Sequence, residues 1–126
     1  MGTRSRIGIQ LKDDSILSVY HHYDGYPQWL GVKLEQLFYT RDLVTELIDG
    51  GDMSVCYKSD QSPIPEYYSS ERGENYPPHH DSTLEEYLED GEEYAYVYTK
   101  NNVWKCFDRH EFDDDKAPEL VPIPMG

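Results

Sequence analysis

The sequence predicts an α+β fold, in which an antiparallel sheet from two β-hairpins carries a short helical pair packed on one face. Three observations predict it. Apolar and polar side chains alternate in residues 3–23 and again in residues 93–107, which is the period-two pattern of half-buried strands. Between them, residues 30–48 carry apolar side chains at helical spacing. The chain has 126 residues, the size of one domain.

The first hairpin begins with a strand over residues 3–11, in which isoleucine and leucine occupy every second position from residue 7. Asp13 and Asp14 follow, and consecutive aspartates are typical of a turn. Residues 15–23 alternate again, so we expect them to return beside the first strand.

Two short helices are predicted next. Pro27 suits the first turn of a helix, because the N–H that proline lacks has no partner there. Thr40 suits the N-cap of a second helix, whose apolar stripe ends at Ile48. Gly50 and Gly51 are expected to terminate this helix.

The middle of the chain carries weaker signals. A brief strand is expected at residues 53–57, followed by a long irregular loop over about residues 58–81, which is rich in proline and serine. Ser82 and Glu85 match a capping box, so we expect a short acidic helix that Gly91 closes.

The second hairpin is predicted from two strands, residues 93–99 and residues 103–107. Asn101 and Asn102 join them, and asparagine tolerates the positive φ of a tight turn. From about residue 113 the chain carries acids and prolines, which predicts an extended tail. All of these elements fit a single domain over residues 1–126.

The charge is negative and uneven. The net charge is −14, of which residues 51–126 supply −12, with 18 acidic and six basic residues. This balance disfavours direct nucleic-acid binding, and no apolar run is long enough for a membrane span or a signal peptide. Cys56 and Cys106 lie 50 residues apart without a CxxC motif, so we expect two reduced thiols.

The segment of residues 20–27 holds most of the candidate site, at the passage from strand to helix. Histidine, tyrosine and a carboxylate could together donate to, accept from and stack on a planar ligand, and helix starts favour anions. Residues 3–5 join them, since the hairpin turn places the two segments side by side. The candidate ligand-binding residues are Arg4, Tyr20, His22, Tyr23, Asp24 and Tyr26. The alternative is an ordinary turn at Asp24, beside histidines that alternate across a strand.

No catalytic residue, metal site or cofactor is assigned. The sequence has no GxSxG motif and no phosphate-binding loop, and with 25 acidic residues any chosen carboxylate pair is uninformative. His21 and His22 are neighbours on a strand and point to opposite faces, as do His79 and His80 if extended, which disfavours a shared ion. We therefore expect a binding protein, with a hydrolase as a remaining alternative.

The acidic second part suggests another function. The carboxylates of residues 81–93 and of Asp113, Asp114 and Asp115 could imitate the phosphates of a DNA duplex. Such a surface would inhibit a basic nucleic-acid-binding host protein. Acidic surfaces also simply keep small proteins in solution, so both interpretations stand.

The GTRS motif at residues 2–5, the HYDGYP motif at residues 22–27 and the aromatic hairpin ending near Trp104 resemble a family of small tailed-phage and prophage proteins. Members often carry tryptophan at the position of Tyr23. The family has no established activity. The resemblance implies a phage accessory protein in the cytoplasm of an infected bacterium. Its partner would be a nucleotide-type small molecule or a host protein. Separately, the tyrosine-rich face of the last strands suits either a homo-oligomer interface or the packing of the helices.

Overall fold

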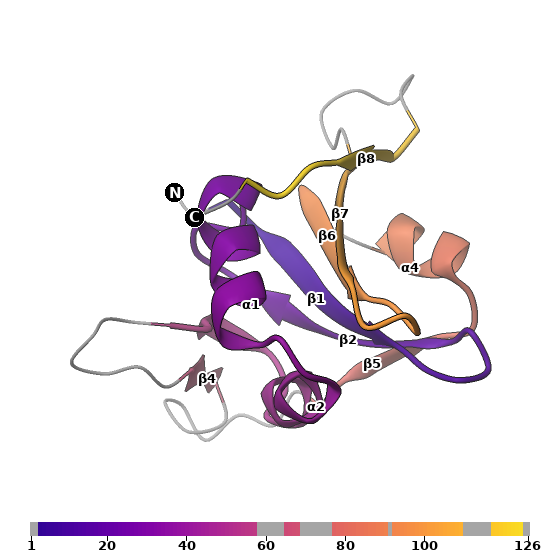
Figure 1. Ribbon diagram of the computed structural model, residues 1–126, viewed down its shortest axis with the longest axis horizontal. Coiled ribbons are helices and arrows are strands. Elements are labelled where there is room, and N and C mark those ends of the chain that lie inside the picture. The colour runs from indigo at the N-terminus through magenta and orange to yellow at the C-terminus, as the bar shows by residue number, and fades with distance from the viewer. Residues whose placement is uncertain (1–2, 58–64, 69–76, 91, 110–116, 125–126) are drawn as a thin grey trace.

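The computed structural model describes residues 3–57, 65–68, 77–90, 92–109 and 117–124, which form one mixed sheet with helices on both faces (Figure 1). In chain order the elements are β1 (Ser5–Gln10), β2 (Ile16–His21), the π-helix η1 (Pro27–Gly31), α1 (Val32–Leu37), α2 (Arg41–Asp49), β3 (Met53–Val55), β4 (Glu66–Tyr67), β5 (His79–Asp81), α4 (Leu84–Asp90), β6 (Tyr94–Tyr98), β7 (Trp104–Asp108) and β8 (Glu119–Val121). The strand order is β4-β3-β2-β1-β6-β7-β8, and β5 also pairs with β2. The α+β class predicted from the sequence is confirmed.

Both predicted hairpins are present. β1 and β2 pair antiparallel with Ile7 opposite Val19, and Asp14 takes a φ of 73° in their turn. β6 and β7 pair antiparallel, and Asn102 has a φ of 62° between them. Asp14 and Asn102 thus adopt the left-handed backbone conformation, which aspartate and asparagine tolerate better than most residues.

The two hairpins dock in a way that the sequence did not predict. β1 and β6 run parallel, with Ile7 opposite Tyr96, so the sheet is mixed and not purely antiparallel. β2 and β3 also run parallel, with His21 opposite Met53. The alternation of side chains fixes which residues share a face, but it is the same for either strand direction.

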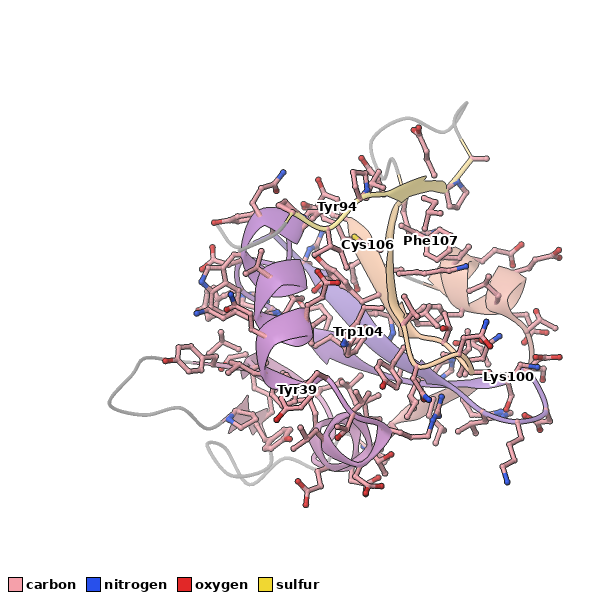
Figure 2. All side chains as sticks on the ribbon, in the orientation of Figure 1. Tyr39, Tyr94, Lys100, Trp104, Cys106 and Phe107 are labelled. Carbon is pink, nitrogen blue, oxygen red and sulfur yellow. The ribbon has the colours of Figure 1, made fainter. Side chains whose placement is uncertain are left out.

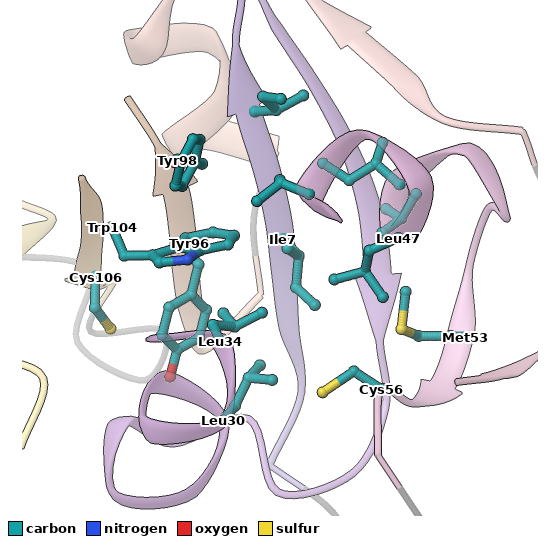
Figure 3. Close-up of a cluster of buried hydrophobic side chains, with 14 residues drawn as sticks. Ile7, Leu30, Leu34, Leu47, Met53, Cys56, Tyr96, Tyr98, Trp104 and Cys106 are labelled. Carbon is teal, nitrogen blue, oxygen red and sulfur yellow. The ribbon is translucent and has the colours of Figure 1, made fainter. Parts of the chain in front are cut away.

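The helical pair packs on one face of the sheet, as predicted. Leu34 of α1 and Leu47 of α2 lie in one buried cluster with Ile7 and Tyr96 from the central strands (Figure 3). Near full burial of an aliphatic side chain contributes roughly 1.5–3 kcal/mol, so this cluster is a main source of stability. The helix predicted after Pro27 begins as η1 and continues directly into α1.

Thr40 caps α2 as predicted. Its Oγ1 accepts a hydrogen bond from the backbone N–H of Leu43 at 3.2 Å. At the other end, Gly51 has a φ of 84°, a backbone conformation that favours glycine. These two positions fix the ends of the helix that carries Arg41.

The opposite face of the sheet is covered in part by α4. Tyr87 is fully buried over Gly8, where an added Cβ would lie 3.1 Å from Tyr87 Cζ. The Tyr87 hydroxyl donates to the backbone oxygen of Tyr96 at 2.7 Å. Glycine in β1 therefore makes room for an aromatic ring that anchors the helix.

The predicted capping box lies one residue later than expected. Thr83 Oγ1 accepts from the N–H of Glu86 at 3.2 Å, and Glu86 Oε2 accepts from the N–H of Ser82 at 2.9 Å. The sequence holds Ser82 and Glu85 one position before Thr83 and Glu86, so spacing alone permits either pair.

The prediction of an irregular loop over residues 58–81 is wrong at two places, because Glu66–Tyr67 form β4 and His79–Asp81 form β5. β4 forms by backbone pairing with β3, and β5 forms by backbone pairing with β2. The turn-forming residues of this segment do not prevent such pairing. Residues 58–64 and 69–76 of that loop, and residues 113–116 of the predicted tail, lie outside the described residues. In the tail, Glu119–Val121 are extended as expected and pair with β7.

Cys56 and Cys106 are free and buried thiols. Burial raises the pKa of each thiol to about 12, so neither is a nucleophile near neutral pH. The expectation of two reduced cysteines agrees with the structure.

Candidate functional site

Polar side chains gather where β1 begins and β2 ends, on the sheet face that α4 covers only in part. Arg4 precedes β1 by one residue, and Arg6 follows two positions later and points to the same side. Arg6 is directly opposite Tyr20 of β2. We call this surface the polar face, and its residues are Arg4, Arg6, Tyr20, His22, Asp52 and His79.

Arg6 is held against β2. Its Nε donates to Ser18 Oγ at 3.0 Å, and its Nη2 donates to the Ser18 backbone oxygen at 3.3 Å. A cleft of about 370 Å³ lies in front of it, lined by Arg6, Asp52, Pro77 and His79. A cavity of this volume lies within the range of small-ligand sites, roughly 300–1,000 Å³.

Tyr20 and His22 form a hydrogen-bonded pair beside Arg6. The Tyr20 hydroxyl lies 2.6 Å from His22 Nδ1, and the two ring centroids are 5.7 Å apart. Burial, followed by the negative charge of Glu92, raises the pKa of Tyr20 to about 12. The hydroxyl therefore stays protonated at neutral pH, and the Tyr20 side chain carries no charge.

Asp52 positions the strand that carries this pair. Its Oδ1 accepts a hydrogen bond from the backbone N–H of Tyr20 at 2.9 Å. Asp52 comes directly after Gly51, so the end of α2 places the carboxylate at the edge of β2. The backbone N–H that would otherwise be unpaired at this edge is satisfied.

Arg4 approaches Glu92. Arg4 Nε lies 3.9 Å from Glu92 Oε2, and the arginine side chain is 44% exposed. Asp24 is exposed and has a φ of 53°, so its backbone conformation shapes the turn. Arg4 and Asp24 share an end of the sheet, as expected, and Glu92 lies two residues before β6, beside the start of β1.

The other predicted residues surround the turn after β2. Tyr23 is exposed, and its ring meets His22 edge-on at a centroid distance of 4.6 Å. Tyr26 is half-buried and directly precedes η1 in an extended conformation. The structure thus joins Arg4, Tyr20 and His22 on the polar face with Tyr23 at its border, whereas Asp24 and Tyr26 belong to the turn.

The two sequence motifs touch each other at Gly25. Its N–H donates to the Thr3 backbone oxygen at 2.7 Å, and a Cβ built on it would lie 2.6 Å from Ser5 Oγ. The Tyr96 hydroxyl donates to the Gly25 oxygen at 2.7 Å. This part of the HYDGYP motif therefore has a structural role, because the contacts of Gly25 hold together the segments that carry the polar face.

The histidine pairs of the sequence separate as the strand alternation predicts. His21 is fully buried on the helical face, where its Nε2 accepts from the Cys56 N–H at 3.0 Å. Burial lowers the pKa of His21 to about 3. His79 is half-exposed and lies 3.4 Å from the buried Asp81 carboxylate. Within the described part of the chain, no three side chains are grouped as metal ligands.

Arg6, Asp52, His79 and Glu92 were not among the predicted site residues. The signal for Arg6 was its spacing of two from Arg4. The other three approach through β3, β5 and the start of β6, whose neighbours in the sheet are not adjacent in sequence. No local pattern could have found them.

Comparison with known proteins adds no relative. No family model matches the chain, no curated protein matches its sequence, and no solved structure matches its fold. Among the described helices, none has the length and apolar character to cross a bilayer.

Proposed function

We propose that this protein acts by stoichiometric binding and that its polar face holds a nucleotide-type ligand. One observation carries the proposal: two arginines, a tyrosine and a histidine from paired strands share one side of the sheet beside a cleft. In this arrangement Arg4 and Arg6 bind the phosphate, and the base stacks on the rings of Tyr20 and His22.

The polar face suits a phosphate because Arg6 is held in place by neutral groups, the hydroxyl and the backbone oxygen of Ser18. The contact between Arg4 and Glu92 is long at 3.9 Å and partly exposed, and such pairs contribute about 0–1 kcal/mol. A phosphate that binds two guanidinium N–H groups replaces it with shorter, charge-assisted hydrogen bonds.

The resemblance of the GTRS and HYDGYP motifs to tailed-phage proteins supports a proposed cellular setting. As a phage accessory protein, the chain would act by occupying a target, which we propose is a nucleotide messenger or a host protein in the cytoplasm of the infected cell. Because burial raises the pKa of the Tyr20 hydroxyl to about 12, this hydroxyl is a poor nucleophile beside His22, and we propose sequestration of the ligand and not its turnover.

A thermal-shift titration tests the proposal, with 5′-AMP, 5′-GMP and cyclic di-GMP as probes. A ligand at 100 times its Kd adds about 2.7 kcal/mol, which moves the Tm of a domain of this size by several degrees. Arg4→Gln should remove the shift and leave the Tm of the free protein nearly unchanged. Lys105→Gln removes the same charge from an exposed position on β7 and should keep the shift. Absence of any shift in the wild-type protein contradicts the proposal.

An acidic DNA mimic is the second candidate, and α4 favours it. Glu85, Glu86 and Glu89 are exposed on this helix, whereas Asp113, Asp114 and Asp115 lie outside the described residues. The test is displacement of a labelled duplex from a basic histone-like protein. A DNA mimic should lose affinity steeply as salt rises, and indifference to salt would exclude it.

A further inference from the structure

A second cavity lies on the helical face of the sheet, away from the polar face. It has a volume of about 510 Å³, is partly open to solvent and is bordered by α2, the tip of the β1–β2 hairpin and the β6–β7 turn. Its apolar wall is formed by Ile9, Leu11, Leu17 and Ile48, which belong to the cluster under the helices or pack against it. Figure 2 shows Lys100 on the turn at this end of the molecule.

Arg41 is fixed in the wall of this cavity by neutral groups. Its Nη1 donates to the Gln10 oxygen at 3.1 Å, and its Nη2 donates to the Thr99 oxygen at 2.8 Å. Its Nε bonds Asn102 Oδ1 at 3.3 Å, and its Cζ lies 5.4 Å from the Tyr98 ring centroid. No carboxylate of the described residues forms an ion pair with it, so the guanidinium keeps a full charge in a fixed position.

Two lysines extend the positive rim. Lys12 is exposed at the hairpin turn, and Lys100 lies in the β6–β7 turn, where it pairs with Asp14. Asp49 is the one carboxylate among the residues that line the cavity. Three of the 11 basic residues therefore meet at one apolar pocket in a chain of net charge −14.

We propose that this cavity binds a small amphiphilic anion, a carboxylate or sulfonate attached to an aliphatic or aromatic body. The apolar body fills the space against Leu17 and Ile48. The acid group faces Arg41, whose guanidinium is already held in place and loses little freedom on binding. A neutral apolar ligand leaves the charge of Arg41 unused, and a cation is disfavoured because Lys12, Arg41 and Lys100 outnumber Asp14 and Asp49 around the cavity.

The test is an NMR titration of the ¹⁵N-labelled protein with sodium decanoate, with 1-decanol and decyltrimethylammonium as matched probes. Saturable shifts should be confined to residues 9–12, 17, 41–49 and 99–102. We expect decanol to bind about tenfold more weakly than decanoate, and the ammonium compound not to bind there. Equal binding of all three probes, shifts elsewhere only, or no shift up to about 1 mM overturns the proposal.

Two variants test the location without disturbing the side-chain hydrogen bonds of Arg41. Thr45 is exposed on α2 and lines the cavity, so Thr45→Phe should fill it and abolish decanoate binding. Lys12→Glu should raise the Kd about fivefold through the reversed charge at the rim. Lys105→Glu makes the same change of net charge on β7 and should leave the Kd unchanged. If Lys105→Glu and Lys12→Glu weaken binding equally, the effect is general electrostatics and the proposed site is wrong.

Discussion

The Tyr20 hydroxyl and His22 Nδ1 lie 2.6 Å apart at the end of β2, and this pair orients two rings beside Arg6. The pair joins residues two positions apart, which share a face because strand side chains alternate. A hydrogen bond between them removes rotational freedom before any ligand arrives. The polar face is therefore organised in the free protein.

Tyr20→Phe tests the contribution of this pair to binding. The ring remains, but His22 Nδ1 loses its partner, and a net hydrogen bond contributes about 0.5–1.5 kcal/mol. We expect the affinity for the nucleotide probe to fall about three- to tenfold in a calorimetric titration. An unchanged affinity would mean that the orientation of His22 plays no part.

Gly25→Ala should destabilise the fold, because the new Cβ meets the backbone oxygen of Thr3 and the Oγ of Ser5, each at 2.6 Å. Overpacking of this kind costs about 1–3 kcal/mol, measured by urea denaturation. Asp24→Gly in the same turn is the control. It relieves a positive φ of 53° and should leave stability unchanged or raise it slightly. An equal loss of stability in both variants would contradict the structural role assigned to Gly25.

The stability of the protein should fall in acid through His21. Burial lowers the pKa of this side chain to about 3, whereas it is about 6.5 in the unfolded chain. The unfolded state therefore binds an extra proton between these two values, so stability is full above about pH 6.5 and declines as the pH falls towards 3. The slope is about 1.4 kcal/mol per pH unit.

His21→Gln separates this contribution from the many surface carboxylates. Denaturant titrations at about pH 7 and about pH 5 give the loss of stability for the wild-type protein and the variant. We expect the loss to be smaller in the variant by about 1–2 kcal/mol. The same loss in both proteins would show that His21 titrates normally.

Thr83→Ala and Ser82→Ala distinguish the two possible capping boxes of α4. Loss of the Thr83 hydroxyl removes the acceptor of the Glu86 N–H and should cost about 1 kcal/mol. Ser82 contributes its backbone N–H to Glu86, which alanine retains, so Ser82→Ala should be close to neutral in thermal denaturation. A larger loss of stability in Ser82→Ala than in Thr83→Ala would mean that Ser82 and Glu85 form the capping box, as predicted from the sequence.

The features that were predicted correctly from the sequence are those that depend on a local pattern of residues. Alternation placed Arg4, Tyr20 and His22 on one face, and the hairpin turn brought the first of them beside the other two. The same reasoning located Thr40 as a helix cap. These features involve residues a few positions apart or joined by one tight turn.

The remainder of the site depends on pairings between distant segments. Asp52 and His79 approach β2 from β3 and β5, and Glu92 approaches Arg4 because β6 lies parallel to β1. Each arrangement is decided by which sheet edge a short strand covers, and backbone hydrogen bonding is nearly independent of side-chain type. No spacing in the sequence encodes it.

The most direct test of the proposed binding function is isothermal titration with whichever of 5′-AMP, 5′-GMP and cyclic di-GMP gives the largest thermal shift. The account predicts one site per chain, an affinity reduced at least about tenfold in Arg4→Gln and His22→Ala, and an unchanged affinity in Lys105→Gln. Binding that is equal in all four proteins, or no measurable heat with any probe, would contradict it.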